Sequence, residues 1–258
     1  MKRSVKALLG AVSALAMLAL TTHASGQTPM PGAPGFTIDY DIHAKGVVAG
    51  QFIYRVKRAG DAYEASADRK MTGLVRMAVG DKQDYHYASK GNVTAAGVAP
   101  ISYEHVGGKR KRVVKVNFTV DDIVTTATPQ MGMGNPPATK AQRTGAIDQL
   151  SSILAMSMND GDPCKRTLRV YLDGRSRFDL VMTPNGTEKV SSAAFKGNAH
   201  RCSVQFKPIA GFSDPQEPAT LSFLFGAVGS VYAPIKIAMP TDDAGIVILE
   251  AKSFKLQS

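Results

Sequence analysis

The sequence predicts a mainly β fold: a single antiparallel sheet, barrel-like or strongly curved, that carries one amphipathic helix and one disulfide. Short stretches in which apolar and polar residues alternate recur at near-regular spacing, and Gly, Asp or Asn turns separate most of them. One segment in the middle of the chain has helical spacing instead. Nine or more short strands favour a closed or strongly curved sheet, because closure removes exposed strand edges.

Residues 1–24 have the features of a secretory signal peptide. Three basic residues precede an apolar run over residues 7–20, and Thr22-His23-Ala24 is a small-x-small cleavage site. The run is too short to span a bilayer comfortably, and no later stretch approaches that length. Because the first cysteine is Cys164, no lipid anchor is expected at the cleavage site. The mature chain is therefore predicted to be a soluble periplasmic protein without a transmembrane segment.

The chain has an excess of positive charge. Its 31 basic and 21 acidic residues give a net charge of +10, and removal of the three basic residues of the signal leaves +7. An exported basic protein meets the phosphates of phospholipid or lipopolysaccharide and acidic wall polymers. We expect such anionic envelope partners, and no nucleic acid.

Residues 25–35 form a Pro/Gly-rich linker, and residues 36–258 are expected to form one β domain. In its first half, apolar and polar residues alternate with period two in seven stretches. In the sixth, Val114, Val116, Phe118 and Val120 fall on one face of a strand, as expected of a sheet with one solvated side. The predicted strands of this half are residues 36–42, 52–57, 62–71, 85–89, 101–106, 113–120 and 123–127.

A long loop and a helix separate the two halves. Residues 128–143 hold three Pro and two Gly and support no period, so they are predicted to form a loop or lid, with Met131 and Met133 as the residues that would line an adaptable apolar mouth. Thr144 is the expected cap of a helix over about residues 145–158, in which apolar residues recur at helical spacing.

Strands resume after the helix. Asp173-Gly174 and Asn185-Gly186 are strong hairpin signals, and each predicts a turn between two strands. The strands predicted in this half are residues 168–172, 178–182, 190–195, 202–206, 222–225, 232–239 and 246–254.

Cys164 and Cys202 are the two cysteines of the chain. Because the export signal indicates an oxidising compartment, we expect them to form a structural disulfide. Two buried thiols or a redox pair are the alternatives, although reactive pairs usually have C-x-x-C spacing.

Several short motifs, in this order, resemble the bacterial envelope family known as domain of unknown function 3108 (DUF3108). They begin with Tyr40, Gly46 and Gly50 and include Gly145–Ser151, Val170–Leu180, Cys202–Gly211 and Tyr232–Ile235. The resemblance implies a design similar to periplasmic barrels that wrap an apolar cavity, such as lipoprotein carriers, and it supplies no catalytic residue. Members often have Pro where this chain has Gln149, which is expected to alter how the helix begins.

Lys109, Arg110, Lys111 and Arg112 follow Gly107-Gly108 between two predicted strands, so they are expected at a hairpin tip. A solvated turn explains them most simply. The functional alternative is contact with anionic head groups, each basic residue contributing about 1 kcal/mol near a charged surface.

No cofactor or metal is expected. Four histidines remain after the signal, and none has metal-ligand spacing; His86 and His105 lie on predicted strands that are candidates for proximity. The Met-x-Met pairs alone do not predict a copper site, and no G-x-S-x-G elbow supports a serine hydrolase.

The leading hypothesis is a non-enzymatic envelope-maintenance protein whose cavity or concave face holds a lipid, an acyl chain or a lipoprotein segment. The alternative is an interaction module with a packed interior, which docks on another envelope protein through a strand edge or the Met-containing loop. A hydrolase is a third and weaker reading.

Overall fold

A computed structural model describes residues 34–241 and 245–257. The predicted signal peptide and nearly all of the predicted linker lie outside this part. The strands are β1 (Phe36–Ala44), β2 (Val47–Ala59), β3 (Ala62–Met71), β4 (Tyr85–Thr94), β5 (Gly97–Gly107), β6 (Arg112–Phe118), β7 (Ile123–Thr128), β8 (Thr167–Leu172), β9 (Ser176–Ser191), β10 (Lys196–Ala210), β11 (Ala219–Val228), β12 (Val231–Thr241) and β13 (Gly245–Leu256). The helices are α1 (Gly73–Val79), a 3-10 turn η1 (Gly80–Gln83), α2 (Lys140–Arg143) and α3 (Gln149–Ser157).

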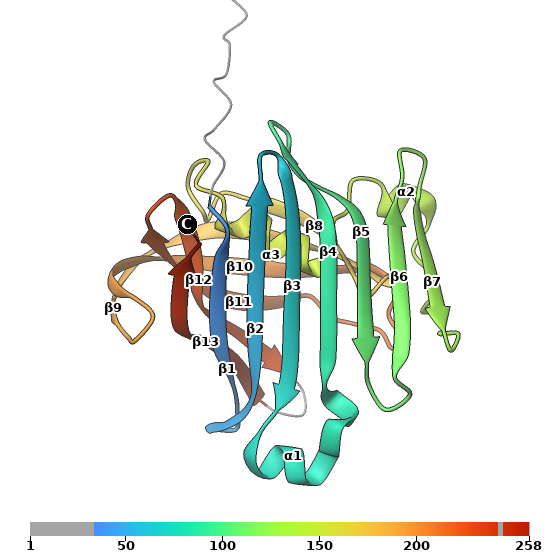
Figure 1. Cartoon of the computed structure of the whole chain (residues 1–258), viewed down its shortest axis with the longest axis horizontal. Helices are drawn as coiled ribbons and strands as arrows, with labels where there is room; N and C mark the ends of the chain where they lie inside the picture. The colour runs from blue at the N-terminus through green and yellow to red at the C-terminus, as the bar shows by residue number, and fades with distance from the viewer. Residues whose placement is uncertain (1–33, 242–244, 258) are drawn as a thin grey trace, which may run out of the picture. The chain divides into compact units, whose positions relative to one another are not determined.

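All of these strands belong to one antiparallel sheet, in the order β7-β6-β5-β4-β3-β2-β1-β13-β12-β11-β10-β9-β8. Each neighbour in the first half is the next strand of the chain, and Figure 1 shows β1 to β7 side by side. The pairing of β1 with β13 joins the two halves. Because β7 and β8 do not pair with each other, the sheet is open, which confirms a curved antiparallel sheet and not a hydrogen-bonded barrel.

The sheet curves around α3. This helix packs against β3, β4 and β5 and also against β8 and β12, which are far apart in the strand order. One helix can contact both sets only if the sheet bends around it. Side chains also connect the two edge strands, since Thr125 Oγ1 of β7 lies 3.5 Å from Tyr171 Oη of β8.

The main core lies between the sheet and α3. Tyr54 Oη donates to the backbone oxygen of Leu150, 2.8 Å away, so an inward strand residue is tied directly to the helix. Val114 and Val116 are fully buried, as the period-two pattern predicts. The prediction for Val120 was wrong: β6 ends at Phe118, and Val120 is fully exposed in the following turn.

The long helix begins later than predicted. Thr144 ends the short helix α2, which Thr139 caps with its side chain, and Gly145 then takes a positive φ of 70°. Ile147 next pairs with the edge of β8, donating to Arg169 O and accepting from Tyr171 N. These backbone bonds hold residues 145–147 out of a helix.

Asp148 is therefore the true N-cap of α3, and its carboxylate accepts from the backbone N–H groups of Leu150 and Ser151. The helix starts at Gln149, a first-turn position that would also accept Pro. The other side of α3 is buried too, because Ser151, Ser152 and Ser157 are enclosed along with its apolar residues. Within the described residues, no helix has the length and apolar character needed to cross a membrane.

One of the two predicted hairpins is confirmed and the other is wrong. Asp173 and Gly174 both adopt positive φ, 52° and 66°, between β8 and β9, as a tight hairpin turn requires. Asn185-Gly186 instead lies inside β9, which pairs with β10 on both sides of it. The pairing of β9 with β10 shifts register opposite this segment, so Asn185-Gly186 forms a β-bulge. The chain reverses later, where Ser192 N donates to Phe195 O.

The loop after β7 is anchored to the end of β10 through glycine. Gly211 has a φ of 82°, and a Cβ added there would lie 2.0 Å from the carbonyl oxygen of Arg175. Its own N–H donates to Pro136 O, and Asn135 N donates to Phe212 O. The backbones approach too closely for any side chain at this position, which explains the glycine at the end of the Cys202–Gly211 motif.

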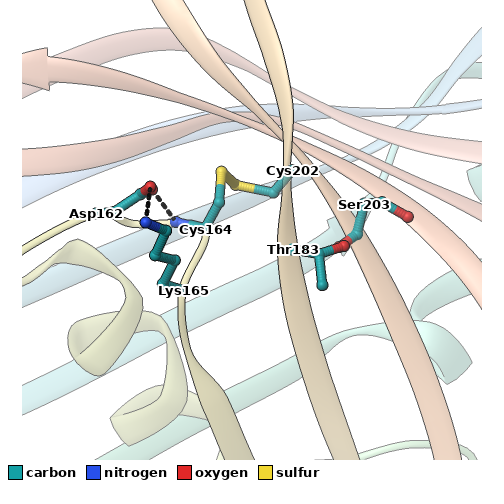
Figure 2. Close-up of a disulfide and its surroundings, with 6 residues drawn as sticks. All are labelled: Asp162, Cys164, Lys165, Thr183, Cys202 and Ser203. Atoms are coloured by element: carbon teal, nitrogen blue, oxygen red, sulfur yellow. Dashed lines mark hydrogen bonds and ion pairs between the residues drawn. A yellow bond between two sulfur atoms is a disulfide. The ribbon is translucent and has the colours of Figure 1, made fainter.

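The predicted disulfide is confirmed. Cys164 and Cys202 are bonded, with their Cα atoms 5.2 Å apart, and join the segment after α3 to β10 (Figure 2). Both lie in a second buried cluster that includes Met156, Val204 and Phe225. The side chain of Asp162 accepts a hydrogen bond from the backbone N–H of Cys164 at 2.9 Å, which fixes the backbone just before the disulfide.

Candidate anion-binding site

A pocket of about 270 Å³ lies at the start of β4, the end of β5 and the start of β6. Its lining combines one phenol, one imidazole, two glycines and three cations: Tyr85, His105, Gly107, Gly108, Lys109, Arg110 and Arg112. The lining contains no carboxylate, and it contains no serine, threonine or cysteine nucleophile. Its volume suits a small anionic group with a few waters, since drug-sized ligands occupy about 300–1,000 Å³.

The two glycines let the backbone lie against Tyr85. A Cβ at Gly107 would come within 2.4 Å of Asp84 O, and one at Gly108 would come within 2.6 Å of Tyr85 Oη. Gly108 N donates to Asp84 O at 3.2 Å, which ties the β5–β6 turn to the start of β4. Lys111, with a φ of 48°, completes the turn.

The four cations of the predicted hairpin tip do not share one environment. Lys111 points away from the pocket to an ion pair with Asp81, 2.8 Å away. The guanidinium of Arg112 donates to two backbone oxygens, Pro129 O at 2.9 Å and Gln130 O at 3.3 Å. Lys109 and Arg110 are exposed and make no hydrogen bond or ion pair with the described part of the chain.

A further cation contacts the pocket residue Tyr85. Arg69 Cζ lies 4.5 Å from the centre of the Tyr85 ring, a cation–π contact, and its side chain donates to Gln83. The site therefore has Lys109, Arg110 and Arg112 in its lining and Arg69 behind it, without an acid to neutralise them. Such an arrangement attracts anions.

His105 joins the pocket to the interior. Its Nδ1 lies 3.0 Å from Tyr103 Oη and 3.6 Å from Asp173 Oδ1, and Tyr103 Oη donates to the same carboxylate oxygen at 3.2 Å. The phenol of Tyr103 therefore links the ring of His105 to the carboxylate of Asp173. Gln149 Nε2 also donates to Asp173, at 2.7 Å, so the first residue of α3 is part of this chain of contacts.

The imidazole is held neutral. Burial lowers the pKa of His105 below its usual 6.5, with Arg112 and Arg69 acting in the same direction and Asp173 and Glu104 opposing them. An anion in the pocket would favour the protonated form. The strands that carry His86 and His105 are neighbours, but His86 lies opposite Val106 and so faces the other side of the sheet, 2.8 Å from Asp68.

A second polar cluster, fully buried, surrounds Asp148. Its Oδ2 accepts from the hydroxyls of Ser89 at 2.9 Å and Ser151 at 2.5 Å, and Tyr63 Oη lies 2.6 Å from Ser151 Oγ. Burial raises the pKa of Asp148 although these hydrogen bonds lower it. The cluster has no histidine and is closed to solvent, so we assign it a structural role as the N-cap of α3.

The remaining candidate residues lie elsewhere. Met131 is half-buried against the main core and Met133 is half-buried, and neither lines the pocket. No group of three or more potential ligands among residues 34–241 and 245–257 is arranged to hold a metal. Sequence reasoning found the cations but missed Tyr85, because only the register that places Tyr85 opposite Gly107 brings it to them.

The family model described as a protein of unknown function (DUF3108) matches residues 39–252. No curated protein and no solved structure matches the chain.

Proposed function

The chain belongs to the DUF3108 family, whose function is unknown, and from the geometry of its pocket we propose a non-enzymatic envelope protein that binds the phosphate headgroup of a lipid. The observation that carries this proposal is the convergence of Lys109, Arg110 and Arg112 on one pocket whose lining has no acid. Phosphate oxygens accept from arginine and lysine in charge-assisted hydrogen bonds.

The headgroup, and not the acyl chain, is the proposed contact. The apolar face of the sheet is already covered, because Leu150 and Leu154 of α3 are buried in the main core with strand residues from β1 to β6. A pocket of about 270 Å³ does not hold a whole lipid. The lipid tail would remain in its bilayer or in a partner.

A periplasmic location is part of the proposal. The disulfide between Cys164 and Cys202 supports an oxidising compartment. The charged start and apolar run of residues 1–24 support export by a cleaved signal. To test this part, the full chain is expressed and the N-terminus of the exported product is determined.

Titration with glycerol phosphate and with sulfate tests the pocket. The three cations of the lining, of which Lys109 and Arg110 are exposed and Arg112 is half-buried, contribute about 1 kcal/mol each, so dissociation constants on the order of a few millimolar are expected. The double variant Lys109→Ala/Arg110→Ala should weaken binding about 30-fold. Lys189→Ala/Lys196→Ala, which removes the same charge from exposed sites on β9 and β10, is the matched control and should bind as wild type. An equal loss of affinity in both double variants would show that net charge alone determines anion binding, and would overturn the proposal that the pocket binds the anion.

An interaction module is the second candidate, because β7 pairs only with β6 and leaves its other edge without a strand in the described part of the chain. The edge of β8 is partly covered by Ile147, so β7 is the edge suited to an added strand. Binding of a partner that survives the pocket substitutions but is lost when Val124 and Thr126 are replaced by lysine would favour this function.

A further inference from the structure

Apolar side chains are exposed at one end of the sheet. Val47 and Val48 follow the β1–β2 turn and are 59% and 44% exposed, and Met77 of α1 is 82% exposed. An isolated exposed apolar residue is ordinary, but three on neighbouring elements beside a cationic pocket indicate a contact surface.

Hydrogen bonds place these elements together. Thr72 N, before α1, donates to Ala49 O of β2 at 2.9 Å, so the helix is fixed beside the β1–β2 turn. Asp81 of η1 pairs with Lys111, so the helical segment is also fixed beside the β5–β6 turn. Figure 1 shows the three segments along one end of the strands, the end labelled α1. We call residues 45–48, 70–84 and 108–112 the α1 end.

The α1 end is strongly basic. It carries two acids, Asp81 and Asp84, and each is paired with a cation of the same surface, Lys111 and Arg76 respectively. Asp242 and Asp243, which lie between β12 and β13 in the sequence, are outside the described residues. The cations of the α1 end number eight, giving it a net charge of +6: Lys45, Lys70, Arg76, Lys82, Lys109, Arg110, Lys111 and Arg112.

We propose that the α1 end docks on the surface of an anionic bilayer, with Met77, Val47 and Val48 inserted at the boundary between headgroups and acyl chains. The proposal rests on the proposed function, since the pocket lies at the same end and would receive a headgroup from that bilayer. Exposed apolar side chains surrounded by lysine and arginine are the pattern of interfacial membrane binding, in which burial and attraction to anionic lipid add together. Long basic side chains reach the phosphates while apolar ones enter below them.

Co-sedimentation with vesicles tests the docking. The full chain is expressed and the N-terminus of the purified product is determined, because an uncleaved apolar run at residues 7–20 would itself bind vesicles. Wild type should bind vesicles of phosphatidylglycerol and phosphatidylethanolamine, and binding to pure phosphatidylcholine should be weak. Lys109→Ala/Arg110→Ala should lower the partition constant about 30-fold at low salt, about fivefold for each cation.

Matched substitutions test the insertion. Met77→Ser and Val47→Ser/Val48→Ser should each lower partitioning about three- to tenfold. Val120→Ser/Val124→Ser is the control: these valines are also exposed, but Val120 lies in the β6–β7 turn and Val124 near the start of β7, at the other end of the strands, so no loss is expected. An equal loss in the control, or no loss in any apolar variant, would overturn insertion of the α1 end.

The outcomes separate this inference from the proposed function. Wild type that binds glycerol phosphate but no anionic vesicle would overturn the docking and leave the pocket standing. Wild type that binds neither would overturn both. Met77→Ser that keeps its affinity for glycerol phosphate and loses vesicle binding would support both.

Discussion

Replacing Asp148 with alanine is expected to destabilise the fold strongly, because this side chain both caps α3 and binds Ser89 of the sheet. Its Oδ1 accepts from the N–H groups of Leu150 at 2.9 Å and Ser151 at 3.0 Å, and its Oδ2 accepts from two serine hydroxyls. Asp148 has no exposed surface, so water does not replace these bonds unless the structure opens.

The magnitude follows from the contacts that are lost. Loss of the N-cap costs about 1 kcal/mol. The hydroxyls of Ser89 and Ser151 lose their acceptor, but they lie 3.1 Å apart and Tyr63 remains beside them, so we assign about 1 kcal/mol to each and not a full desolvation cost. The total for Asp148→Ala is about 3 kcal/mol. Asp148→Asn keeps one acceptor oxygen and should cost about 1 kcal/mol.

Urea unfolding followed by circular dichroism measures both variants, since the chain has no Trp to report by fluorescence. The reasoning is refuted if Asp148→Ala lies within about 0.5 kcal/mol of wild type, or if Asn is as damaging as Ala.

The same residue gives a pH dependence with a defined sign. Burial raises the pKa of Asp148 in the folded state above its usual 3.8, so the folded state holds the proton more tightly than the unfolded state. Its contribution to the free energy of unfolding is fully present below about 3.8 and is lost as the pH rises through the raised value. The advantage of wild type over Asp148→Asn should therefore shrink as the pH rises across this window.

Three further predictions concern the disulfide, the glycine contact and the pocket histidine. Cys164→Ser/Cys202→Ser should lose about 4 kcal/mol in urea unfolding, because a 38-residue separation is no longer restrained in the unfolded chain. Gly211→Ala should lose about 3 kcal/mol in thermal or urea unfolding, since its φ is positive and the new Cβ meets a carbonyl oxygen. Sulfate, which keeps its charge from pH 5 to 8, should bind wild type about three- to tenfold more tightly at pH 5.5 than at 7.5 by calorimetry, because binding favours protonated His105.

Each has its own control. Reduction of wild type should reproduce the loss seen in the cysteine variant. Gly60→Ala has a similarly positive φ but open space around the new Cβ, so it should cost only about 1 kcal/mol, and an equal cost at both glycines would contradict the close approach. His105→Gln should bind sulfate equally at both pH values; a pH dependence that persists in it belongs to another group.

Local patterns were enough to predict most strands. The alternation around Val114 and Val116 identifies the buried face of β6 because side chains alternate between the faces of a strand. It fails at Val120, since alternation does not reveal where a strand ends. The disulfide was predictable from composition and compartment alone, because two cysteines allow a single pairing.

Turn and cap signals were less reliable where tertiary contacts compete with them. Asn185-Gly186 has the composition of a hairpin turn, but β10 pairs with β9 on both sides of it and makes it a bulge. Thr144 is a good cap residue, but pairing of Ile147 with β8 moves the start of the helix to Gln149. Such pairings link residues distant in sequence, so a short window does not contain them.

The sequence was enough to predict the cations of the candidate site, but not their arrangement. The run Lys109–Arg112 after two glycines is evident, but its division into pocket-lining cations and an ion-paired Lys111 depends on η1. His105 faces the pocket, whereas His86 on the neighbouring strand faces away, and only the register of β4 and β5 decides which does which.

Mapping the binding of glycerol phosphate by NMR tests the central claim most directly. Titration of the isotope-labelled protein should shift the backbone amides of Gly107, Gly108 and Lys109 and the ring of His105, with saturation in the millimolar range. The amides of Leu150 and Leu154 in α3 should stay unchanged. Shifts centred on α3, or shifts spread over all surface lysines without saturation, would contradict an anion-binding pocket at the β5–β6 turn.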